Sequence, residues 1–429
     1  MGTTEHTKYL VIGAGVSGLS FAGRVDSADV LVLDGDSAIG GYCKTIKKDG
    51  FVWDYSGHFF HFKRPEIERY LIDRMPGQNI RVVHKDSRIF HRDPDGQGRL
   101  VDFPFQKNIH QLCKAELLTC LYDLWHKPER LPTSFEDMLT VKFGQAIADK
   151  FLIPYNEKLY ATDLGTLDVE AMGRFFPYAD LDQIIGNFKQ ADNASYNATF
   201  TYPEGGAIEY VKALASGVDP DRIRFGARVT RIDLAERVAH TADGRSFGYE
   251  YLISSAPFSQ LLSMASVVHE PSIYSWNKVL IFNLGFDKKG PEDVHWMYFA
   301  GRDVVFYRTG FYDNIFDTDR MSMYVEIGFP ADGVVTDAVV AEMKARVLVD
   351  LERCGLVDGH RLVAEHSIVL DPAYVHITKD SQRDVGEKKA ILGLRGVHSI
   401  GRYGSWTYCS IEDNIVEAWA LADRFNAVG

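Results

Sequence analysis

The feature that most constrains this chain is a strand, a glycine-rich turn, a helix and a second strand that ends in an acid. The apolar run 8–12 predicts a buried strand, and Gly-Ala-Gly-Val-Ser-Gly at 13–18 follows it directly. The spacing then predicts a helix over 19–24 and a strand over 28–33, with Asp34 at its end. A G-x-G-x-x-G motif in this context is typical of a dinucleotide-binding βαβ unit.

Each part of this motif has its own physical role. The first glycine allows a tight turn, the second lets backbone approach a pyrophosphate, and the third lets the helix pack on the strand. The helix N-terminus attracts phosphates, and the acid can accept hydrogen bonds from a ribose. The alternative is a glycine-rich turn that holds no ligand. The predicted cofactor contacts in this motif are Gly13, Gly15, Val16, Ser17, Gly18 and Asp34.

A second glycine pair follows about six residues after the acid. The segment 40–45 reads Gly-Gly-Tyr-Cys-Lys-Thr. A second glycine pair so close to the first loop suggests that more backbone wraps around a long dinucleotide, which favours FAD over NAD. We expect Gly41, Tyr42 and Lys44 to contact the cofactor, and a simple β-turn is the alternative.

The charge and cysteine content exclude several classes of partner. The chain has 429 residues, with 47 Lys and Arg against 59 Asp and Glu, which gives a net charge of -12. This balance argues against nucleic acid or anionic membranes, but it allows a small anion held by a few arginines. The five cysteines form no C-x-x-C pair, so we expect free thiols and no metal site. A polar start and the lack of a membrane-spanning apolar run predict a cytoplasmic protein.

The rest of the chain predicts an α/β fold in which the nucleotide-binding part is assembled from both chain ends. A turn signal at 93–98 predicts a hairpin. The spacing from 113 to 171 is mostly helical. Residues 401–405 predict a glycine-rich loop. The other expected strands are 222–225, 228–232, 251–255, 278–286, 321–327 and 397–400, and the other expected helices are 338–354 and 412–425.

Several later segments carry a resemblance to a known family. Asp-Tyr-Ser-Gly-His at 54–58, after the paired glycine motifs, resembles the flavin-binding family that includes amine oxidases and UDP-galactopyranose mutases. Further stretches are similar to the mutases, above all to their eukaryotic-type branch, and in order they cover nearly the whole chain. They are 103–109, 154–160, 196–200 with 203–206, 296–299, 306–308 and 401–408.

The resemblance implies a fold and a set of domains. The fold would be a Rossmann-like FAD-binding domain of the GR2-type flavoproteins, with a helical insertion and an antiparallel sheet for the substrate. Residues 1–102, 205–260 and 385–429 would form the discontinuous FAD-binding domain. Residues 103–195 would be the helical nucleotide-sugar-binding insertion, and 261–384 the sheet-rich substrate domain.

The resemblance also assigns roles to single residues. Arg308 and Arg174 would clamp the diphosphate of a nucleotide sugar, and Tyr298 and Tyr408 would contact it. His58 would lie beside the flavin and tune its surroundings. On their own, the arginines could pair with surface acids and the aromatic residues could be packing residues. The other implied contacts are Gln106, Tyr155 and Asn156 with the nucleoside, Asn197 with the sugar or the clamp, and Gly57, Val229 and Arg402 with the cofactor.

The activity implied by the resemblance is redox-neutral. Reduced flavin attacks the anomeric carbon through N5 and displaces the nucleoside diphosphate. The flavin–sugar adduct then opens and recloses through another hydroxyl, so pyranose and furanose forms interconvert. NAD(P)H is a possible reductant. Segments 174–194 and 409–414 differ from the mutases, so another nucleotide, a deoxysugar or an epimerisation stays open.

Two other classes of function stay open at this stage. One is a flavin-dependent oxidase or dehydrogenase of an amine, an alcohol or a sugar. The other is a non-catalytic FAD-binding or nucleotide-sugar-binding protein. We expect Asp54 to order its loop, and the acids 412–413 to lie at a helix N-terminus, where negative charge is favoured.

Overall fold

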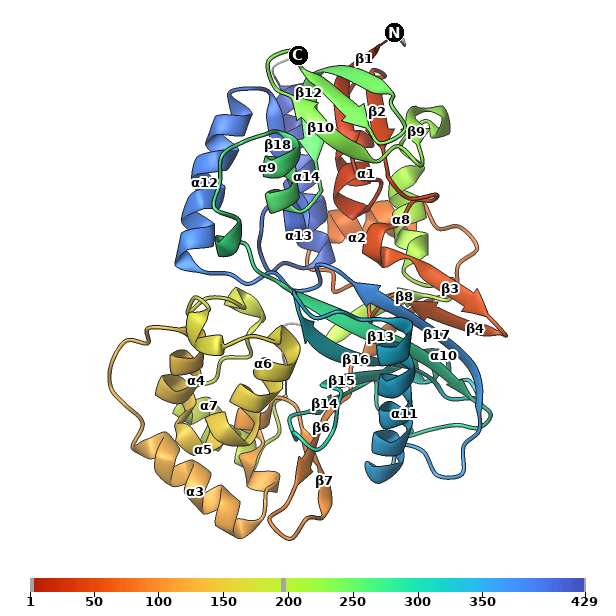
Figure 1. Cartoon of the computed structure of the whole chain (residues 1–429). Helices are drawn as coiled ribbons and strands as arrows, with labels where there is room; N and C mark the ends of the chain where they lie inside the picture. The colour runs from red at the N-terminus through yellow and green to blue at the C-terminus, as the bar shows by residue number, and fades with distance from the viewer. Residues whose placement is uncertain (1–3, 194–197, 428–429) are drawn as a thin grey trace.

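Two seven-stranded sheets organise the part of the chain that the computed structural model describes, residues 4–193 and 198–427 (Figure 1). The first sheet has the order β10-β11-β12-β1-β2-β9, and β18 pairs with β12. Its strands are β1 (Glu5–Ile12), β2 (Val30–Leu33), β9 (Ile223–Arg224), β10 (Val229–Asp233), β11 (Val238–Thr241), β12 (Ser246–Ser254) and β18 (Val397–Ser399). Strands from the start, the middle and the end of the chain therefore meet in one sheet.

The predicted βαβ unit is at the centre of this first sheet. Strand β1 pairs in parallel with both β2 and β12, and helix α1 (Val16–Ala22) connects β1 to β2. All four residues of β2 are buried, as expected for a parallel strand covered on both faces. Helix α8 (Ile208–Ala215) and the C-terminal helix α14 (Ile411–Asn426) pack beside α1. The expected helices and strands at both chain ends are thus confirmed.

The second sheet is mainly antiparallel and forms the other large layer of the molecule. Its order is β17-β13-β16-β15-β14-β6-β7, and only the β14–β6 pair of these neighbours is parallel. Helix α11 (Asp337–Arg353) covers one face, where its Val347 joins the core that includes Phe282. The strands are β6 (Ser87–Arg92), β7 (Gly98–Asp102), β13 (Asn277–Phe286), β14 (Trp296–Phe299), β15 (Arg308–Phe311), β16 (Ser322–Pro330) and β17 (Leu362–Leu370).

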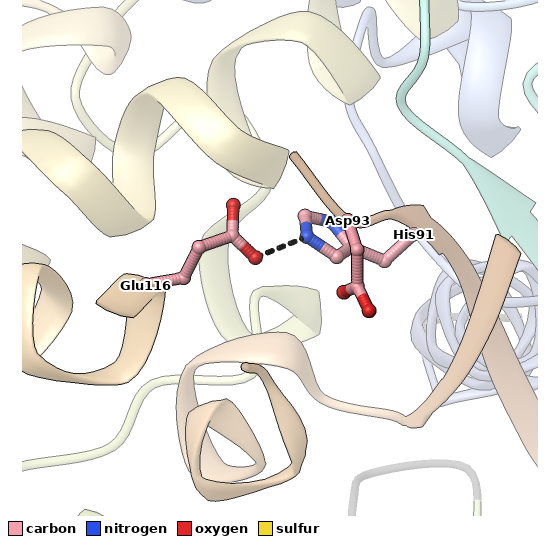
Figure 2. Close-up of side chains that lie close together, drawn as sticks. All are labelled: His91, Asp93 and Glu116. Atoms are coloured by element: carbon pink, nitrogen blue, oxygen red, sulfur yellow. Dashed lines mark hydrogen bonds and ion pairs between the residues drawn. The ribbon is translucent and has the colours of Figure 1, made fainter. Parts of the chain in front are cut away.

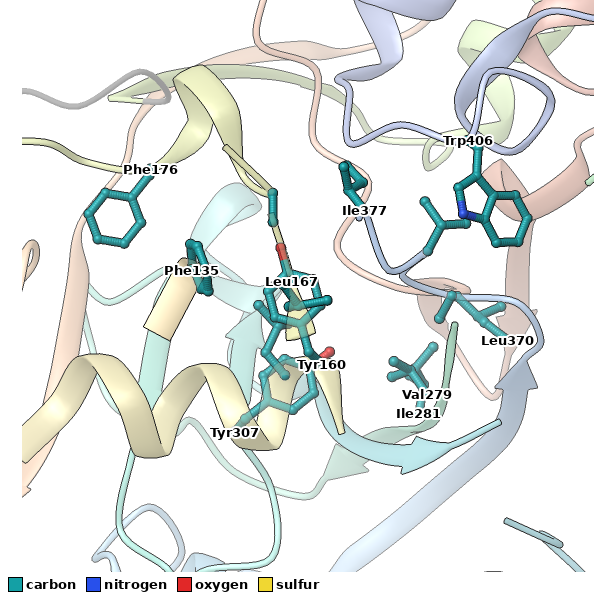
Figure 3. Close-up of a cluster of buried hydrophobic side chains, with 14 of the residues drawn as sticks. Phe135, Tyr160, Leu167, Phe176, Val279, Ile281, Tyr307, Leu370, Ile377 and Trp406 are labelled. Atoms are coloured by element: carbon teal, nitrogen blue, oxygen red, sulfur yellow. The ribbon is translucent and has the colours of Figure 1, made fainter. Parts of the chain in front are cut away.

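A helical region covers the opposite face of the second sheet. Figure 3 shows part of the shared core, where Phe135 and Tyr160 of the helices lie with Ile281 of β13 and with Tyr307. Alternation along β13 explains the two cores, because Ile281 faces the helices while Phe282 faces α11. The helices are α3 (Lys114–Trp125), α4 (Phe135–Phe143), α5 (Gln145–Ile147), α6 (Ile153–Tyr160) and α7 (Leu181–Lys189).

Smaller elements connect these layers. Two short antiparallel pairs, β3–β4 and β5–β8, complete the strands, and β3, β4 and β8 lie between the two large sheets in Figure 1. The remaining elements are α2 (Pro65–Ile72), β3 (Thr45–Lys48), β4 (Phe51–Asp54), β5 (Ile80–His84), β8 (Thr199–Pro203), α9 (Phe258–Met264), α10 (Asp313–Phe316), α12 (Lys379–Gly393) and α13 (Gly401–Gly404).

The structure corrects one sequence expectation and bears on another. Residues 401–404 form the short helix α13 and not a loop, and only its first residue has a positive φ, +84° at Gly401. The hairpin β6–β7 forms as expected, but it pairs with the second sheet although its residues fall in the range 1–102. The division into three domains stays a prediction. Among the described residues, no helix combines the length and the apolar character needed to cross a bilayer.

Candidate functional site

The two glycine motifs face each other with backbone only. A Cβ atom added to Gly15 would lie 3.7 Å from the Cα of Gly41, and one added to Gly41 would lie 3.5 Å from the Cα of Gly15. Gly13 has a φ of +104°, and a Cβ on Gly18 would clash with the carbonyl oxygen of Gly13. The N–H of Gly40 donates to the carbonyl of Ala14 at 3.0 Å. The two loops therefore form a cradle that side chains would fill.

The acid at the end of β2 lies at this cradle. One carboxylate oxygen of Asp34 accepts from the N–H of Ala14 at 2.6 Å, and the other accepts from the N–H of Asp36 at 2.8 Å. The N–H of Ala227 donates to the carbonyl of Asp34 at 2.8 Å, so β10, which begins at Val229, starts close by. The predicted cofactor contacts Asp34 and Val229 thus lie beside the same edge of the cradle.

Three further predicted cofactor residues have partners of their own. The side chain of Lys44 forms an ion pair with Asp36. The hydroxyl of Tyr42 accepts from the N–H of Asp371 at 3.2 Å. The hydroxyl of Ser17, in the first turn of α1, donates to Asn414 of α14 at 3.2 Å. Lys44 and Tyr42 therefore fix the second glycine loop to its surroundings.

A cleft of about 670 Å³ opens between the helical region, the second sheet and the segment that precedes α14. This cleft brings together residues that are far apart in the sequence. The predicted site residues that line it are Gly57, His58, Gln106, Tyr155, Asn156, Arg174, Tyr298, Arg308, Arg402 and Tyr408. Asn197 lies outside the described residues.

Arg308 enters the cleft from the first position of β15 and is held by a buried carboxylate. The strand register places it opposite Glu326 of β16. Its Nε and Nη2 donate to the two oxygens of Glu326 at 2.7 and 2.9 Å, and Glu326 is 1% exposed. The hydroxyl of Ser56 also donates to Glu326. Burial disfavours the charged guanidinium, but the attraction of Glu326 and of nearby tyrosines outweighs it and raises the pKa of Arg308 well above its ordinary value.

Arg174 also lines the cleft, from the single turn Gly173–Phe175. Its Nη2 donates to both carboxylate oxygens of Asp413 at 2.6 and 2.7 Å. The neighbouring ring of Phe175 meets Tyr408 edge to face, with 5.0 Å between centroids. These contacts join the helical region to the first turn of α14. Arg174 and Arg308 thus share one cleft, and each is paired with a different carboxylate.

Arg402, in α13, is the third guanidinium in the cleft. It lies over the rings of Tyr374 and Tyr408, 5.0 and 4.7 Å from their centroids. Its Nε is sealed from solvent and has no hydrogen-bond partner among the described residues. The aromatic rings therefore surround a cation whose buried N–H is still available for a bond.

The histidine of the loop Gly57–His58 is neutral. Burial lowers the pKa of His58 to about 4; Glu326 opposes this shift, and the charges of Arg402 and Arg308 add to it. Its Nδ1 is buried and has no partner among the described residues. Burial also lowers the pKa of His61 to about 4, while its Nδ1 lies 2.8 Å from the carbonyl oxygen of Thr199. Both imidazoles line the cleft without adding charge to it.

The end of the cleft near the helical region is aromatic. Tyr155 stacks on Phe151 at 5.2 Å between centroids and meets Tyr298 edge to face at 5.5 Å. Tyr298 in turn stacks on Phe103 at 4.9 Å. The Nδ2 of Asn156 donates to Leu152 at 2.7 Å, while its Oδ1 is buried without a partner among the described residues. Gln106 donates to the carbonyl oxygen of Pro177.

The acid that the sequence expects to order the loop is fully buried behind the cleft. Asp54 accepts hydrogen bonds from Thr45 at 2.6 Å, from Tyr202 at 2.8 Å and from the N–H of Ala207 at 3.0 Å. Burial raises the pKa of Asp54 to about 7, against the effect of these three donors. Asp54 therefore connects β4 to β8 and to the start of α8. The acids 412–413 lie in the first turn of α14, as expected.

Comparison with known proteins now gives the family. The model of the flavin-containing amine oxidoreductases matches residues 16–353. The chain belongs to this family. Its paired glycine loops, with their backbone-only approach, and the unpartnered polar atoms of His58 and Arg402 in the cleft are features that a flavin dinucleotide fits.

Solved structures show how widely this fold is used. Reduced UDP-galactopyranose mutase is similar with a TM-score of 0.90 and 23% identity, over 99% of this chain and 96% of that one. A proposed protoporphyrinogen oxidase from Exiguobacterium sp. 255-15 gives 0.75 and 16%, over all of both chains. Cyclohexylamine oxidase from Brevibacterium oxydans IH-35A gives 0.66 and 14%, over 98% and 99%. These likenesses confirm the expected fold.

A separate cluster of ionisable side chains lies outside the cleft, between β6 and α3. Figure 2 shows His91, Asp93 and Glu116, whose nearest ligand atoms lie within 4.8 Å of one another. Glu116 already binds His91 at 2.8 Å and Lys150 at 2.7 Å, and Arg99 binds Asp93 at 2.6 Å. Burial would raise the pKa of Glu116, but the hydrogen bonds from Lys150 and His91 leave it below its ordinary value. The polar groups of this cluster are therefore already paired with one another, and the hydrogen bond between His91 and Glu116 joins the hairpin to the helical region.

Two partners of the predicted cleft residues were themselves not predicted. Glu326 pairs with Arg308, and a single acid in the mostly apolar run 321–327 is the signal that could have indicated it. Tyr374 stacks on Tyr408, 5.9 Å between centroids, and carries no comparable signal because only the fold brings it to the cleft. The roles of the predicted site residues stay predictions.

Proposed function

We propose that this protein is an FAD-dependent nucleotide-sugar mutase that interconverts the pyranose and furanose forms of a UDP-galactose-like substrate without net oxidation. The observation that carries the proposal is the cleft in which Arg308, Arg174, Tyr298 and Tyr408 converge. Two guanidiniums and two phenols form a set of donors that suits a diphosphate. An oxidase of a small amine has no need of such a set.

The FAD would lie with its diphosphate at the glycine cradle and with its flavin near Gly57 and His58. When bound in the reduced state, the flavin would supply the nucleophile for exchange at the anomeric carbon. The mutase structure, which is similar over nearly the whole chain, was determined for a reduced enzyme, and this supports the choice of redox state. NADPH or NADH is the reductant that we propose.

Arg308 and Arg174 would stabilise the leaving diphosphate. Its charge increases as the bond to the anomeric carbon breaks, and fixed donors in a site that excludes water stabilise such charge best. Because Glu326 takes Nε and Nη2 of Arg308, its Nη1 is the nitrogen left to meet the phosphate. Tyr298 and Tyr408 would add hydroxyl donors, and both phenols stay protonated at neutral pH because burial raises the pKa of Tyr298 to about 12 and that of Tyr408 still further.

The remaining cleft residues would bind and orient. The stacked pair Tyr155 and Phe151 offers aromatic faces to a nucleobase, and the unpartnered Oδ1 of Asn156 offers an acceptor. Neutral His58 can donate or accept one hydrogen bond near the flavin without changing the charge of the site. The nucleoside diphosphate would thus stay in place while the sugar changes ring size.

A direct experiment uses the reduced holoprotein. It is incubated without oxygen with UDP-galactopyranose, UDP-glucose and dTDP-sugars, and the products are separated by chromatography. We expect a furanose product from at least one nucleotide sugar with the reduced protein and none with the oxidised protein. Turnover by the oxidised protein alone, with formation of peroxide or of a reduced acceptor, would contradict the mutase proposal.

A variant tests the diphosphate site. Arg308→Lys keeps a cation beside Glu326 but loses the planar guanidinium, so we expect affinity for UDP to fall at least about tenfold while FAD stays bound. Arg302→Ala is the matched control, because its guanidinium pairs with Glu157 and its side chain is 75% exposed. Unchanged affinity in the Arg308 variant, measured by titration calorimetry, would remove Arg308 from the substrate site.

The second candidate function is a flavin-dependent oxidase or dehydrogenase of an amine, an alcohol or a sugar. Two of the similar structures carry oxidase names, and they support this alternative. The aromatic lining of the cleft by Phe103, Phe151 and Phe175 would also suit an apolar substrate. The same incubation separates the two functions, because an oxidase consumes an acceptor and a mutase does not.

A further inference from the structure

Arg402 differs from the other two arginines of the cleft because no carboxylate is paired with it. Arg308 is paired with Glu326, and Arg174 is paired with Asp413. Among residues 4–193 and 198–427, no carboxylate lies within ion-pair distance of Arg402. Its neighbours are the rings of Tyr374 and Tyr408, which offer cation–π contact but no negative charge. A guanidinium always carries its proton, so the positive charge of Arg402 is uncompensated.

The backbone of Arg402 is fixed to the dinucleotide motif. Its N–H donates to the side chain of Asn414 at 2.7 Å, and the same oxygen of Asn414 accepts from the hydroxyl of Ser17 in α1. A Cβ atom on the preceding Gly401 would clash with the hydroxyl of Ser17. Helix α13 therefore packs directly on the first turn of the helix that meets the cofactor. Arg402 is anchored there by its backbone, not by its charge.

Its side chain lines the same cleft as the loop Gly57–His58. The pKa of His58 is lowered mainly by burial, and the charge of Arg402 adds to this shift. Arg402 is thus tied by its backbone to the dinucleotide motif and lines the cleft that also holds the loop Gly57–His58. A cofactor that runs from one to the other would lie near Arg402. A partly buried charge without a counter-ion is costly, so an anionic group at this place would be strongly favoured.

The charge of a flavin depends on its redox state. The oxidised ring is neutral. It takes up two electrons and one proton at N5, and the reduced ring then carries one negative charge over N1 and the C2 carbonyl. A cation near this edge of the ring stabilises the reduced form more than the oxidised form, which raises the reduction potential.

We propose that Arg402 is the counter-charge of the anionic reduced flavin and that it holds the cofactor in the reduced state. The proposal rests on the FAD binding of the proposed function, but not on the identity of the substrate. It makes Arg402 a determinant of the redox state in which the protein works. Arg308 and Arg174 are then left to the diphosphate of the substrate.

The test compares reduction potentials of the bound FAD. Arg402→Met removes the charge and keeps the length of the side chain. We expect this variant to bind reduced FAD at least about tenfold less tightly relative to oxidised FAD, which lowers the midpoint potential by about 30 mV for a two-electron couple. Arg402→Lys keeps a charge, so its midpoint potential should lie between those of Arg402→Met and the wild type. The potentials are measured against reference dyes during anaerobic reduction.

The matched control is Arg174→Met, which removes a cation from the same cleft. Because Asp413 already balances that charge, the potential should stay close to the wild-type value. If Arg402→Met does not retain FAD, the midpoint potential of Arg402→Lys is compared with that of the wild type at saturating FAD. We then expect a smaller decrease of the potential than for Arg402→Met. A potential that is unchanged or higher when Arg402 is replaced overturns the proposal. An equal loss of affinity for both redox states would do the same, and would place Arg402 at the FAD diphosphate.

These outcomes are independent of the mutase assay. A lower potential in Arg402→Met, together with no furanose product from the wild type, would support the role of Arg402 and contradict the proposed function. An unchanged potential together with furanose formation would contradict the role of Arg402 and support the proposed function.

Discussion

At the scale of single residues, the two buried histidines of the cleft have a consequence for stability. His58 and His61 each have a pKa of about 4 in the folded protein, mainly because burial disfavours the charged imidazole. An unfolded histidine has a pKa of about 6.5. Between these values the unfolded chain binds more protons, so stability falls as the pH is lowered from about 6.5 toward 4.

We therefore expect His58→Asn to make the FAD-free protein less sensitive to acid. The loss of unfolding free energy between pH 7 and pH 5 should shrink by about 2 kcal/mol, since the variant has no imidazole to protonate on unfolding. Urea denaturation at the two pH values measures this change in the free energy of unfolding. His84→Asn, at an exposed position, is the control and should behave as wild type. An equal acid sensitivity of His58→Asn and wild type would mean that His58 is charged when folded.

The pair Arg308–Glu326 allows a second prediction at this scale. Removing Arg308 leaves the carboxylate of Glu326 buried without its partner, so Arg308→Met should destabilise the protein by about 3–5 kcal/mol. The double variant with Glu326→Met should recover much of this loss, because no charge stays buried. Urea unfolding of the four proteins gives the coupling energy. A double variant that is as unstable as the sum of the single variants would contradict the assignment.

The residues that could be predicted are those with a local pattern. Arg308 follows Tyr298 at a fixed spacing, and the cleft contains both. Its partner Glu326 depends on the register of β15 with β16, which no local pattern records. The ion pair between Arg174 and Asp413 joins residues more than 200 positions apart and is equally hidden. The sequence and its resemblance to a family thus indicated side chains that line the cleft, and the tertiary fold decides what each of them contacts.

At the scale of elements, the glycine motif gives a prediction with a matched pair. Gly18 and Gly186 are both helical glycines, in α1 and α7. A Cβ on Gly18 would meet the backbone of Gly13, whereas one on Gly186 would meet nothing within 4 Å. We expect Gly18→Ala to cost about 1–3 kcal/mol and to lower the FAD content of the purified protein. Gly186→Ala should stabilise by about 0.5–1 kcal/mol, since alanine is the better helix former.

Thermal unfolding and the FAD absorbance of the purified protein measure these effects. Normal FAD content in Gly18→Ala would mean that α1 can move away from β1 without loss of the cradle.

The helices and strands that could be predicted from the sequence are those with a local pattern of their own. The βαβ unit and the hairpin β6–β7 carry period and turn signals, and both form. Strands β14 and β15 are four residues long and are held by pairing with distant strands, so no segment pattern predicts them. Helix α13 was expected to be a loop because two of its four residues are glycines, and its packing on α1 overrides that propensity.

At the scale of the whole molecule, the charge is arranged in an unusual way. A protein with a net charge of -12 holds three arginines in one cleft, and two of them are already paired with acids. An incoming diphosphate must therefore compete with Glu326 and Asp413. Glu326 is buried within a sheet, whereas the side chain of Asp413 is 34% exposed and lies at the start of α14. The pair Arg174–Asp413 is the one that can exchange its anion without disturbing a core.

This difference gives a prediction for Asp413→Asn. The amide keeps the acceptor that binds Ser410 at the N-terminus of α14 but loses the charge that attracts Arg174. Since exposed ion pairs contribute about 0.2–1 kcal/mol, releasing Arg174 should raise the affinity for UDP by up to about fivefold at low salt. The gain should shrink as salt screens the pair.

Titration calorimetry with UDP at low and high ionic strength makes the comparison. Asp380→Asn is the control, because that acid pairs with Arg383 within α12, outside the cleft. Unchanged or weaker binding in Asp413→Asn would show that Arg174 does not reach the diphosphate. Arg308 would then bind it alone, and the ion pair across the cleft would serve only to join the helical region to α14.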